Sequence, residues 1–338
     1  MTLQSTWFLL IGVLLTGYAI LDGFDLGVGF WHLFTRGDKE RRTLLNAIGP
    51  VWDGNEVWLL TGGGAIFAAF PHVYATVFSG MYLALMLVLL ALIFRAVSLE
   101  FRSKDPSPRW RSAWDVAFSL GSMLPALLFG VAVGNILRGL PLDESMNYTG
   151  SFFTLLNPYA LVVGLIGFSM FATHGALYLV LKTEGDLANR ARTWARKAWM
   201  VFVLLFLVGN VLTFATQSRL LANYNETPLL WVIPVLAFGA IILTGIFNRT
   251  GADGKAFLFS CISILGLITL CAVALFPNMV PALGRPELSL TITNASSSAL
   301  TLKTMLILAL IGMPIVIGYT IWVYRIFSGK VKLNEDSY

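Results

Sequence analysis

Long apolar segments recur along the whole chain and constrain its fold more than any other feature of the sequence. A helix needs about 20 mainly apolar residues to cross the hydrocarbon core of a bilayer. Nine segments meet this requirement, at residues 6–34, 44–70, 73–101, 113–138, 157–181, 196–219, 229–248, 255–277 and 304–327. The uncharged run from Val57 to Phe94 is too long for one crossing, so we divide it at Pro71, a residue type that ends helices. We therefore expect an all-α integral membrane protein with nine transmembrane helices, forming one polytopic domain over residues 1–338.

The composition agrees with a chain whose main solvent is lipid. Hydrophobic residues make up 57% of the sequence and charged residues only 12%, which is far from the average soluble domain. Such a chain has too much apolar surface to hide inside a water-soluble fold.

Lysine and arginine are distributed unevenly among the connections between the predicted helices. Eighteen of the 23 lie in alternate connections and in the C-terminal tail, whereas the N-terminus and the remaining loops hold four and Arg95 falls within a helix. Cytoplasmic loops of membrane proteins carry the excess of basic residues. We therefore expect the N-terminus outside and the C-terminus in the cytoplasm. The net charge of +5 then reflects topology, and we expect no nucleic-acid partner.

Four carboxylates fall inside the first two predicted spans. Asp22 and Asp25 are three residues apart, as are Asp53 and Glu56, so each pair shares one face of its helix. If the second helix begins near residue 44, both pairs lie roughly 13–18 Å from the inner surface, at about 1.5 Å per residue. Arg95, in the third span, is placed to reach them. We expect one polar cluster that opens toward the cytoplasm.

Two interpretations of this cluster are open. It can be an ion-paired clasp that fixes helix packing, with Arg95 neutralising one or two of the acids. It can also be a proton path, because clustered buried carboxylates hand protons on near neutral pH. We favour the proton path, since four acids against one arginine leave an excess of negative charge that a clasp does not need.

Histidines, the usual ligands of haem and metals, are few. His32 and His72 lie near predicted helix ends, and His174 lies inside the fifth predicted span. A lone buried histidine is more often hydrogen-bonded to a neighbouring helix than bound to iron. Since no cluster of cysteine and histidine has metal-binding spacing, we expect no metal site and no haem ligand in this chain.

The motifs that carry the carboxylates resemble subunit II of the cytochrome bd-type quinol oxidases. They read GFDLGVGFW at 23–31 and GPVWDGNEVWLLTGGGAIFAAFP at 49–71. Other stretches that resemble the family follow in order, namely RSKDPSPRWRSAWD at 102–115, GN at 134–135, LLNP at 155–158 and NASSSALTL at 294–302. The resemblance covers nearly the whole chain.

This resemblance implies a respiratory complex of the bacterial inner membrane that oxidises quinol, such as ubiquinol, and reduces dioxygen to water. It places haems b and d in a partner, subunit I. The present chain would be the pseudo-symmetric partner, with two four-helix bundles and one additional helix, and would be needed for assembly without being catalytic alone. In some relatives quinone is also a structural ligand of subunit II. Membrane lipids and a small accessory subunit complete the set of partners that the resemblance implies.

The resemblance also suggests roles for individual residues. The aspartates that match Asp25 and Asp53 are associated in the family with proton uptake from the cytoplasm, and the tryptophan that matches Trp52 is functionally important. Asp22 shares the first motif, and Glu56 occupies a position that is glutamine in some relatives. We expect these five residues to form the proton pathway. A proton-coupled secondary transporter and a purely scaffolding membrane subunit are the alternatives, because buried carboxylates on glycine-interrupted helices also occur in transporters.

Overall fold

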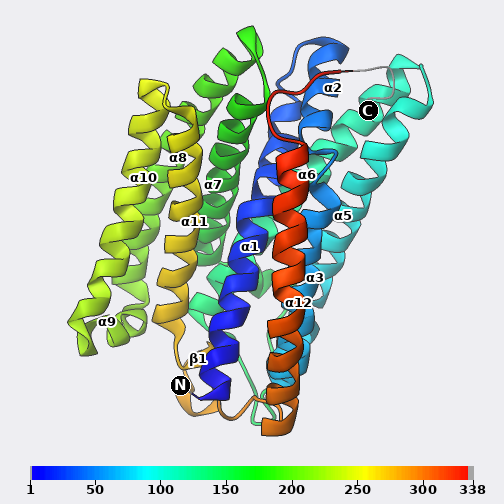
Figure 1. The fold of residues 1–338 in the computed structure, drawn as a ribbon. Helices are drawn as coiled ribbons and strands as arrows, with labels where there is room; N and C mark the ends of the chain where they lie inside the picture. Colours follow the sequence, from blue (N-terminus) through cyan, green and yellow to red (C-terminus); the bar gives the residue numbers. More distant parts are fainter. Residues whose placement is uncertain (1, 334–338) are drawn as a thin grey trace.

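The computed structural model describes residues 2–333, which form a bundle of helices lying roughly along one axis (Figure 1). The helices of the first half are α1 (Leu3–His32), α2 (Gly37–Ile48), α3 (Trp52–Ala69), α4 (Pro71–Gly80), α5 (Tyr82–Phe101), η1 (Arg102–Lys104), α6 (Pro108–Arg138) and η2 (Phe152–Leu156). The second half contains α7 (Pro158–Lys182), α8 (Gly185–Thr216), η3 (Ser218–Leu221), α9 (Ala222–Glu226), η4 (Pro228–Trp231), α10 (Val232–Thr250), α11 (Asp253–Leu275), η5 (Pro286–Leu288) and α12 (Ala299–Ile326). A two-stranded antiparallel ribbon, β1 (Asn278–Val280) with β2 (Leu290–Thr291), is a small addition to the expected all-α fold.

Eight helices within the described residues are long and apolar enough to cross a membrane, namely α1, α5, α6, α7, α8, α10, α11 and α12. This supports the prediction of a multi-pass membrane protein. Helix α3 is not among the eight. It has 18 residues, and its first two turns carry Asp53 and Glu56, which lower its apolar character.

Two predicted spans are each divided in the structure. Residues 44–70, which we expected to form one helix, are split between α2 and α3 by a turn at residues 49–51. Pro50 lies in this turn, and proline removes a backbone donor and clashes with the preceding helical turn. Residues 73–101 are likewise split at Met81, between α4 and α5. The predicted break at Pro71 is confirmed, because this residue is the first of α4.

Close approach of backbones at glycines holds the centre of the bundle together. A Cβ atom added to Gly27 of α1 would lie 2.9 Å from Cα of Gly175 on α7. A Cβ atom added to Gly130 of α6 would lie 2.8 Å from Cα of Gly164 on α7. Small residues allow this approach in membrane helices, where dispersion between closely packed surfaces drives association. Gly27 of α1 and Gly130 of α6 thus let both helices pack directly on α7.

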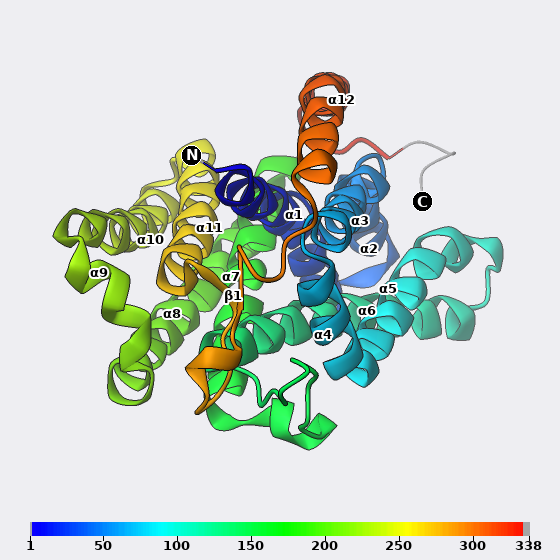
Figure 2. The ribbon, with the colours of Figure 1, turned by 90° about the horizontal axis from the view of Figure 1, so that it is seen from below.

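Helix α12 stands at the edge of the bundle, where it contacts α1 and α3 (Figure 2). The most apolar 18-residue window of α12 contains no buried residue. Helix α2 lies at the end of the molecule where α12 finishes, whereas β1 and α9 lie at the opposite end, where α1 begins (Figure 1).

Candidate functional site

Arg95, on α5, is fully buried and pairs with two of the predicted carboxylates. Its guanidinium donates two hydrogen bonds to Asp22 of α1, one of them 2.9 Å long from Nη1 to Oδ2. Nη2 also lies 3.5 Å from Oε1 of Glu56 on α3, whose side chain is 24% exposed. The paired bonds to Asp22 match the fork of a guanidinium to the two oxygens of a carboxylate. The prediction that Arg95 reaches the acids is confirmed for Asp22 and Glu56.

Asp25 lies one helical turn beyond Asp22 and is also fully buried, but it has a different set of partners. Its Oδ2 accepts a 2.8 Å hydrogen bond from Nδ2 of Asn55 on α3. Its Oδ1 is buried and has no hydrogen-bond partner among residues 2–333. Asp22 is therefore paired directly with a cation, whereas Asp25 is held by a neutral amide.

Asn55 connects this carboxylate to the last helix. Its Nδ2 also donates to the backbone oxygen of Leu21, 3.2 Å away. Its Oδ1 accepts a 2.8 Å hydrogen bond from the hydroxyl of Tyr324 on α12. Asn55 thus joins α1, α3 and α12 at the level of Asp25. Sequence reasoning missed both Asn55 and Tyr324, although Asn55 lies within the motif at 49–71.

Asp53 and Trp52 lie at the start of α3, and Asp53 is not buried as expected. Because α3 begins at Trp52, Asp53 is in its first helical turn and is exposed in the isolated chain. Its Oδ1 accepts a 2.7 Å hydrogen bond from the backbone nitrogen of Gly54. Trp52 is half-buried and packs against the apolar core formed by α1, α2 and α7. Asp53 therefore lies outside the buried cluster, whereas Asn55 and Glu56, two and three residues further along α3, contact Asp25 and Arg95.

The ring of His174 on α7 is engaged by protein groups on both nitrogens. Nδ1 lies 2.6 Å from the hydroxyl of Ser260 on α11, and Nε2 lies 2.9 Å from the backbone oxygen of Ile20 on α1. The ring is fully buried and stacks on Phe257. His174 is thus a hydrogen-bonded link between helices, the interpretation that we favoured from the sequence. Within residues 2–333, no group of three or more acidic, histidine or cysteine side chains is arranged to hold a metal ion.

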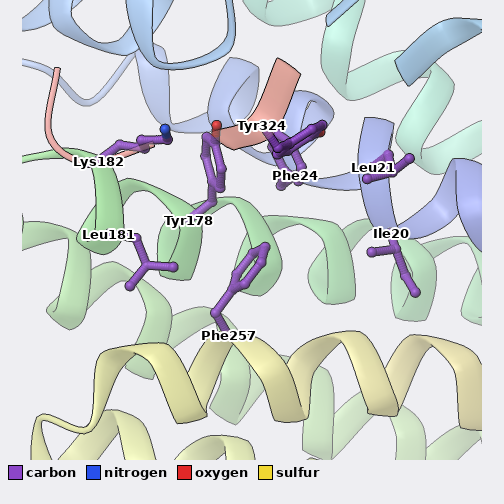
Figure 3. Close-up of a pocket in the computed structure, with 9 residues that line it drawn as sticks. Ile20, Leu21, Phe24, Tyr178, Leu181, Lys182, Phe257 and Tyr324 are labelled. Atoms are coloured by element: carbon purple, nitrogen blue, oxygen red, sulfur yellow. The ribbon is translucent and has the colours of Figure 1, made fainter. Parts of the chain in front are cut away.

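A cavity of about 410 Å³ adjoins this region between α1, α7, α11 and α12 (Figure 3). Phe24, Tyr178 and Tyr324 line it. The rings of Phe24 and Tyr178 are stacked, with centroids 3.9 Å apart. The hydroxyl of Tyr178 donates a 3.0 Å hydrogen bond to the backbone oxygen of Ala47, at the end of α2.

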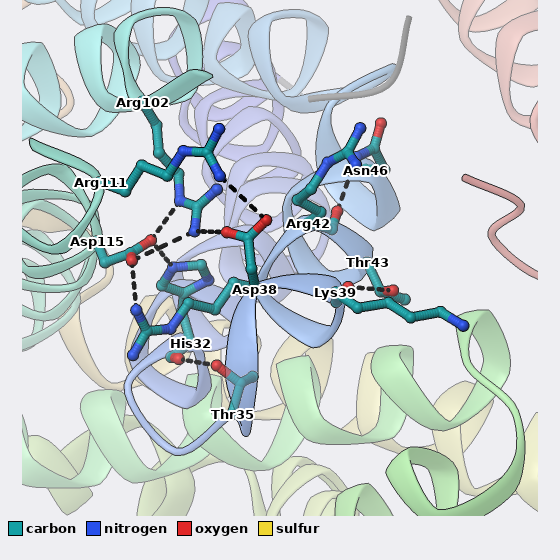
Figure 4. Close-up of polar contacts among 11 residues, drawn as sticks. His32, Thr35, Asp38, Lys39, Arg42, Thr43, Asn46, Arg102, Arg111 and Asp115 are labelled. Atoms are coloured by element: carbon teal, nitrogen blue, oxygen red, sulfur yellow. Dashed lines mark hydrogen bonds and ion pairs between the residues drawn. The ribbon is translucent and has the colours of Figure 1, made fainter. Parts of the chain in front are cut away.

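A second buried ionic cluster surrounds Asp115 near the start of α6 (Figure 4). Its Oδ1 lies 2.6 Å from Nε2 of His32 and 2.6 Å from Nε of Arg102, and its Oδ2 lies 2.7 Å from Nη1 of Arg41. Arg102 also contacts Asp38 at 2.7 Å. These side chains come from the end of α1, from α2, from η1 and from α6. Sequence reasoning missed this cluster and placed His32 only near a predicted helix end, although Arg102 and Asp115 are the two ends of the motif at 102–115.

The fold and the site together define a multi-pass helical membrane protein with acidic side chains buried between its helices. The sequence matches the family model described as cytochrome bd terminal oxidase subunit II over residues 3–327. It is 41% identical to the cytochrome bd-I ubiquinol oxidase subunit 2 of Escherichia coli, across 99% of this chain and 96% of that protein. It is 38% identical to the cytochrome bd ubiquinol oxidase subunit 2 of Bacillus subtilis, across 99% of this chain and 98% of that protein. The chain therefore belongs to the family of cytochrome bd terminal oxidase subunit II, as its motifs predict.

The fold is similar to that of a chain in the bd oxidase of Geobacillus thermodenitrificans. The two superpose with a TM-score of 0.79, over 97% of this chain and 99% of the other, at 17% sequence identity. The fold is thus kept where most residues differ. As a subunit II, the chain is part of an oxidoreductase complex that also contains a subunit I.

Proposed function

We propose that this chain is the non-haem subunit of a quinol oxidase in the bacterial inner membrane, where it stabilises the haem-bearing subunit I and delivers cytoplasmic protons to it. Haems b and d would reside in subunit I, and ubiquinol would be the electron donor, as the names of the Escherichia coli and Bacillus subtilis relatives suggest. The chain alone would not be catalytic. Counting α3 as a span gives nine crossings, which fits two four-helix bundles and one additional helix in one polytopic domain.

The proposed proton role follows from the stoichiometry of the reaction. Reduction of one dioxygen to two waters consumes four electrons and four protons, and oxidation of two quinols supplies four electrons and releases four protons. If the consumed protons come from the cytoplasm and the quinol protons leave on the other side, charge crosses the membrane without a pump. Such a reaction requires an acidic path that opens to the cytoplasm.

The environment of Asp25 is the observation that carries this proposal. Asp25 is fully buried, one of its oxygens is unpartnered within residues 2–333, and its only side-chain hydrogen bond comes from a neutral amide. A carboxylate that served only packing would be expected to have a cation, as Asp22 has in Arg95. Glu56 and Asp53 then provide a graded approach, from an exposed helix end to a half-buried and finally a buried acid. Trp52 packs beside the first of these positions.

The distribution of basic residues supports the proposed orientation. Helix α2 contains Lys39, Arg41 and Arg42 and lies at the end of the bundle where α12 finishes. By the positive-inside rule, this end faces the cytoplasm. The N-terminus is then outside and the C-terminal tail inside.

The exposed side of α3 is our candidate for the face that binds subunit I. Asp53 and Glu56 lie on this helix together with Leu60, which is 73% exposed in the isolated chain. Exposed acids on a membrane helix are costly in lipid, so a protein partner is the better cover. The adjoining helix α12 also leaves its apolar window uncovered.

Replacement of Asp25 and of Asp53 by asparagine tests the proposal. Each variant keeps the side-chain shape and removes the group that carries the proton, so quinol-driven oxygen uptake should fall about tenfold or more in the purified complex. The reduced-minus-oxidised visible spectrum should retain its haem bands, because assembly is intact. Normal haem content with unchanged oxygen uptake in both variants would favour the purely scaffolding subunit. A chain that purifies alone and colourless would instead favour the transporter.

A further inference from the structure

Two neighbouring cavities form one cleft at the end of the bundle where α7 and α12 finish. The first, of about 410 Å³, is lined mainly by apolar groups, including Ile20, Leu21 and Phe257. The second, of about 280 Å³, is more polar. It is lined in part by residues 326–332, from the last residue of α12 into the tail. The two share Tyr178, Lys182, Tyr324 and Gly329 in their walls, so they lie side by side, and we treat them as one cleft.

Among the residues that the structure describes, all the charged side chains that line the cleft are lysines. Lys182, Lys330 and Lys332 line it, and no acidic residue does within the described part of the chain. Nζ of Lys182 donates to the backbone oxygen of Phe327 at 2.5 Å, and Nζ of Lys330 donates to the backbone oxygen of Val180 at 2.8 Å. Because an ammonium group has three donors, each of these two lysines keeps two for a further acceptor.

The hydroxyl groups of the cleft are already committed as donors. Tyr178 donates to Ala47, and Tyr324 donates to Asn55. Of these two tyrosines and two lysines, only the lysines therefore keep hydrogen-bond donors for a ligand. Figure 3 shows Lys182 and Tyr178 extending toward the same side, with Leu181 and Phe257 on the other. The cleft thus has a cationic part at the helix ends and an apolar part that reaches between the helices.

We propose that this cleft binds an anionic phospholipid, with its phosphate at Lys182 and Lys330 and one acyl chain in the apolar cavity. Lysines directly after the ends of two spans lie at the level of the headgroups, where they attract anionic lipids. Tyr324 of α12 lines the apolar cavity and the apolar window of α12 is uncovered, so we expect an acyl chain of the surrounding bilayer to enter beside this helix. A quinone does not account for the lysines, because its head is uncharged. This proposal is independent of the proton role of Asp25.

Lipid retention by the whole purified complex tests the proposal. Delipidated complex would be titrated with phosphatidylglycerol or phosphatidylcholine in mixed micelles, and bound lipid would be counted by native mass spectrometry. We expect the unmodified complex to retain phosphatidylglycerol in preference to phosphatidylcholine. The double variant Lys182→Gln/Lys330→Gln keeps amide donors for the two carbonyl contacts but removes both charges, so its affinity for phosphatidylglycerol should fall more than about tenfold.

Two further variants separate the parts of the cleft. Lys197→Gln, on the exposed surface of α8 at the same end of the bundle, is the matched control and should retain the lipid. Leu181→Trp fills part of the apolar cavity without touching the lysines, and it should also reduce retention. Each variant should keep the haem spectrum and oxygen uptake of the unmodified complex, since none alters the candidate proton path.

Three results would overturn the proposal. Equal retention of the two lipids by the unmodified complex would remove the role of charge. Displacement of the lipid by inorganic phosphate at equal concentration, with no effect of Leu181→Trp, would indicate a surface anion site instead of a lipid site. Recovery of a neutral quinone from the cleft, unaffected by the double lysine variant, would identify a different occupant.

Discussion

Arg95 is a buried cation that two carboxylates share. Replacing Arg95 alone should destabilise the complex more than replacing Arg95 and Asp22 together. In Arg95→Gln, Asp22 loses its counterion in a fully buried site, which typically costs about 3–5 kcal/mol. We expect loss of assembled, haem-containing complex in this variant. The double variant Asp22→Asn/Arg95→Gln replaces the ion pair with two neutral amides and should recover much of the complex.

This coupling is measured by the amount of haem per purified complex. The measurement compares Asp22→Asn, Arg95→Gln and the double variant. If the double variant loses as much haem as the sum of the single variants, the pair is not coupled. In that case the clasp interpretation of Asp22 and Arg95 fails.

Tyr324 contributes a single hydroxyl that fixes the orientation of Asn55 and, through it, of Asp25. Tyr324→Phe leaves Oδ1 of Asn55 without its 2.8 Å donor, at a cost of about 1–3 kcal/mol for an unsatisfied buried group. If Asp25 carries protons, oxygen uptake should fall, but less than in Asp25→Asn, because the carboxylate is still present. Steady-state oxygen uptake at several pH values measures this effect. Phe24→Leu, which also alters the aromatic cluster but keeps the Tyr324 hydroxyl, is the control. An equal loss of activity in Phe24→Leu would assign the effect to packing.

At the scale of the helices, the Asp115 cluster joins four elements that meet at the basic end of the bundle. Asp115 has contacts with His32, Arg41 and Arg102, and it is nearly fully buried. Asp115→Asn removes the negative charge that two arginines share, so we expect a clear loss of stability, about 3 kcal/mol. A lower midpoint of thermal unfolding of the complex would measure it. Glu144→Gln, in the loop that follows α6 at the opposite end of the bundle, is the control, because its side chain is 88% exposed. An unchanged midpoint in Asp115→Asn would contradict a structural role for the cluster.

The helices differ in how well the sequence predicts them. Apolar length predicts the long helices, because it depends only on local composition. The turn at residues 49–51 is harder to foresee, since the residues around Pro50 are apolar enough to continue a span. This turn places Asp53 in the first turn of α3, where its side chain is exposed, and it therefore changes the environment of a predicted site residue. Asn55 and Tyr324 meet only through the packing of α3 against α12, a contact between residues 269 positions apart that no local pattern indicates.

At the scale of the whole molecule, the isolated chain has two kinds of exposed apolar surface. Helix α8 exposes Val211, 68% accessible, among other apolar side chains, and this surface has the composition of one that faces lipid. Helix α3 exposes Leu60 on the same helix as Asp53 and Glu56, so its surface combines apolar and acidic groups. Lipid suits the first surface and a protein partner suits the second.

This difference predicts where a bulky side chain would interfere with assembly. Leu60→Trp adds volume where we propose that subunit I packs closely, and overpacking of a protein contact typically costs about 1–3 kcal/mol. Val211→Trp adds a similar volume where fluid acyl chains can move aside, so it should be neutral. Affinity purification through a tag on this chain, followed by measurement of the co-purified haem, compares the two. Less haem with Leu60→Trp than with Val211→Trp is the expected result. The reverse order would move the subunit I contact from α3 to α8, and Asp53 would then need a cover other than that partner.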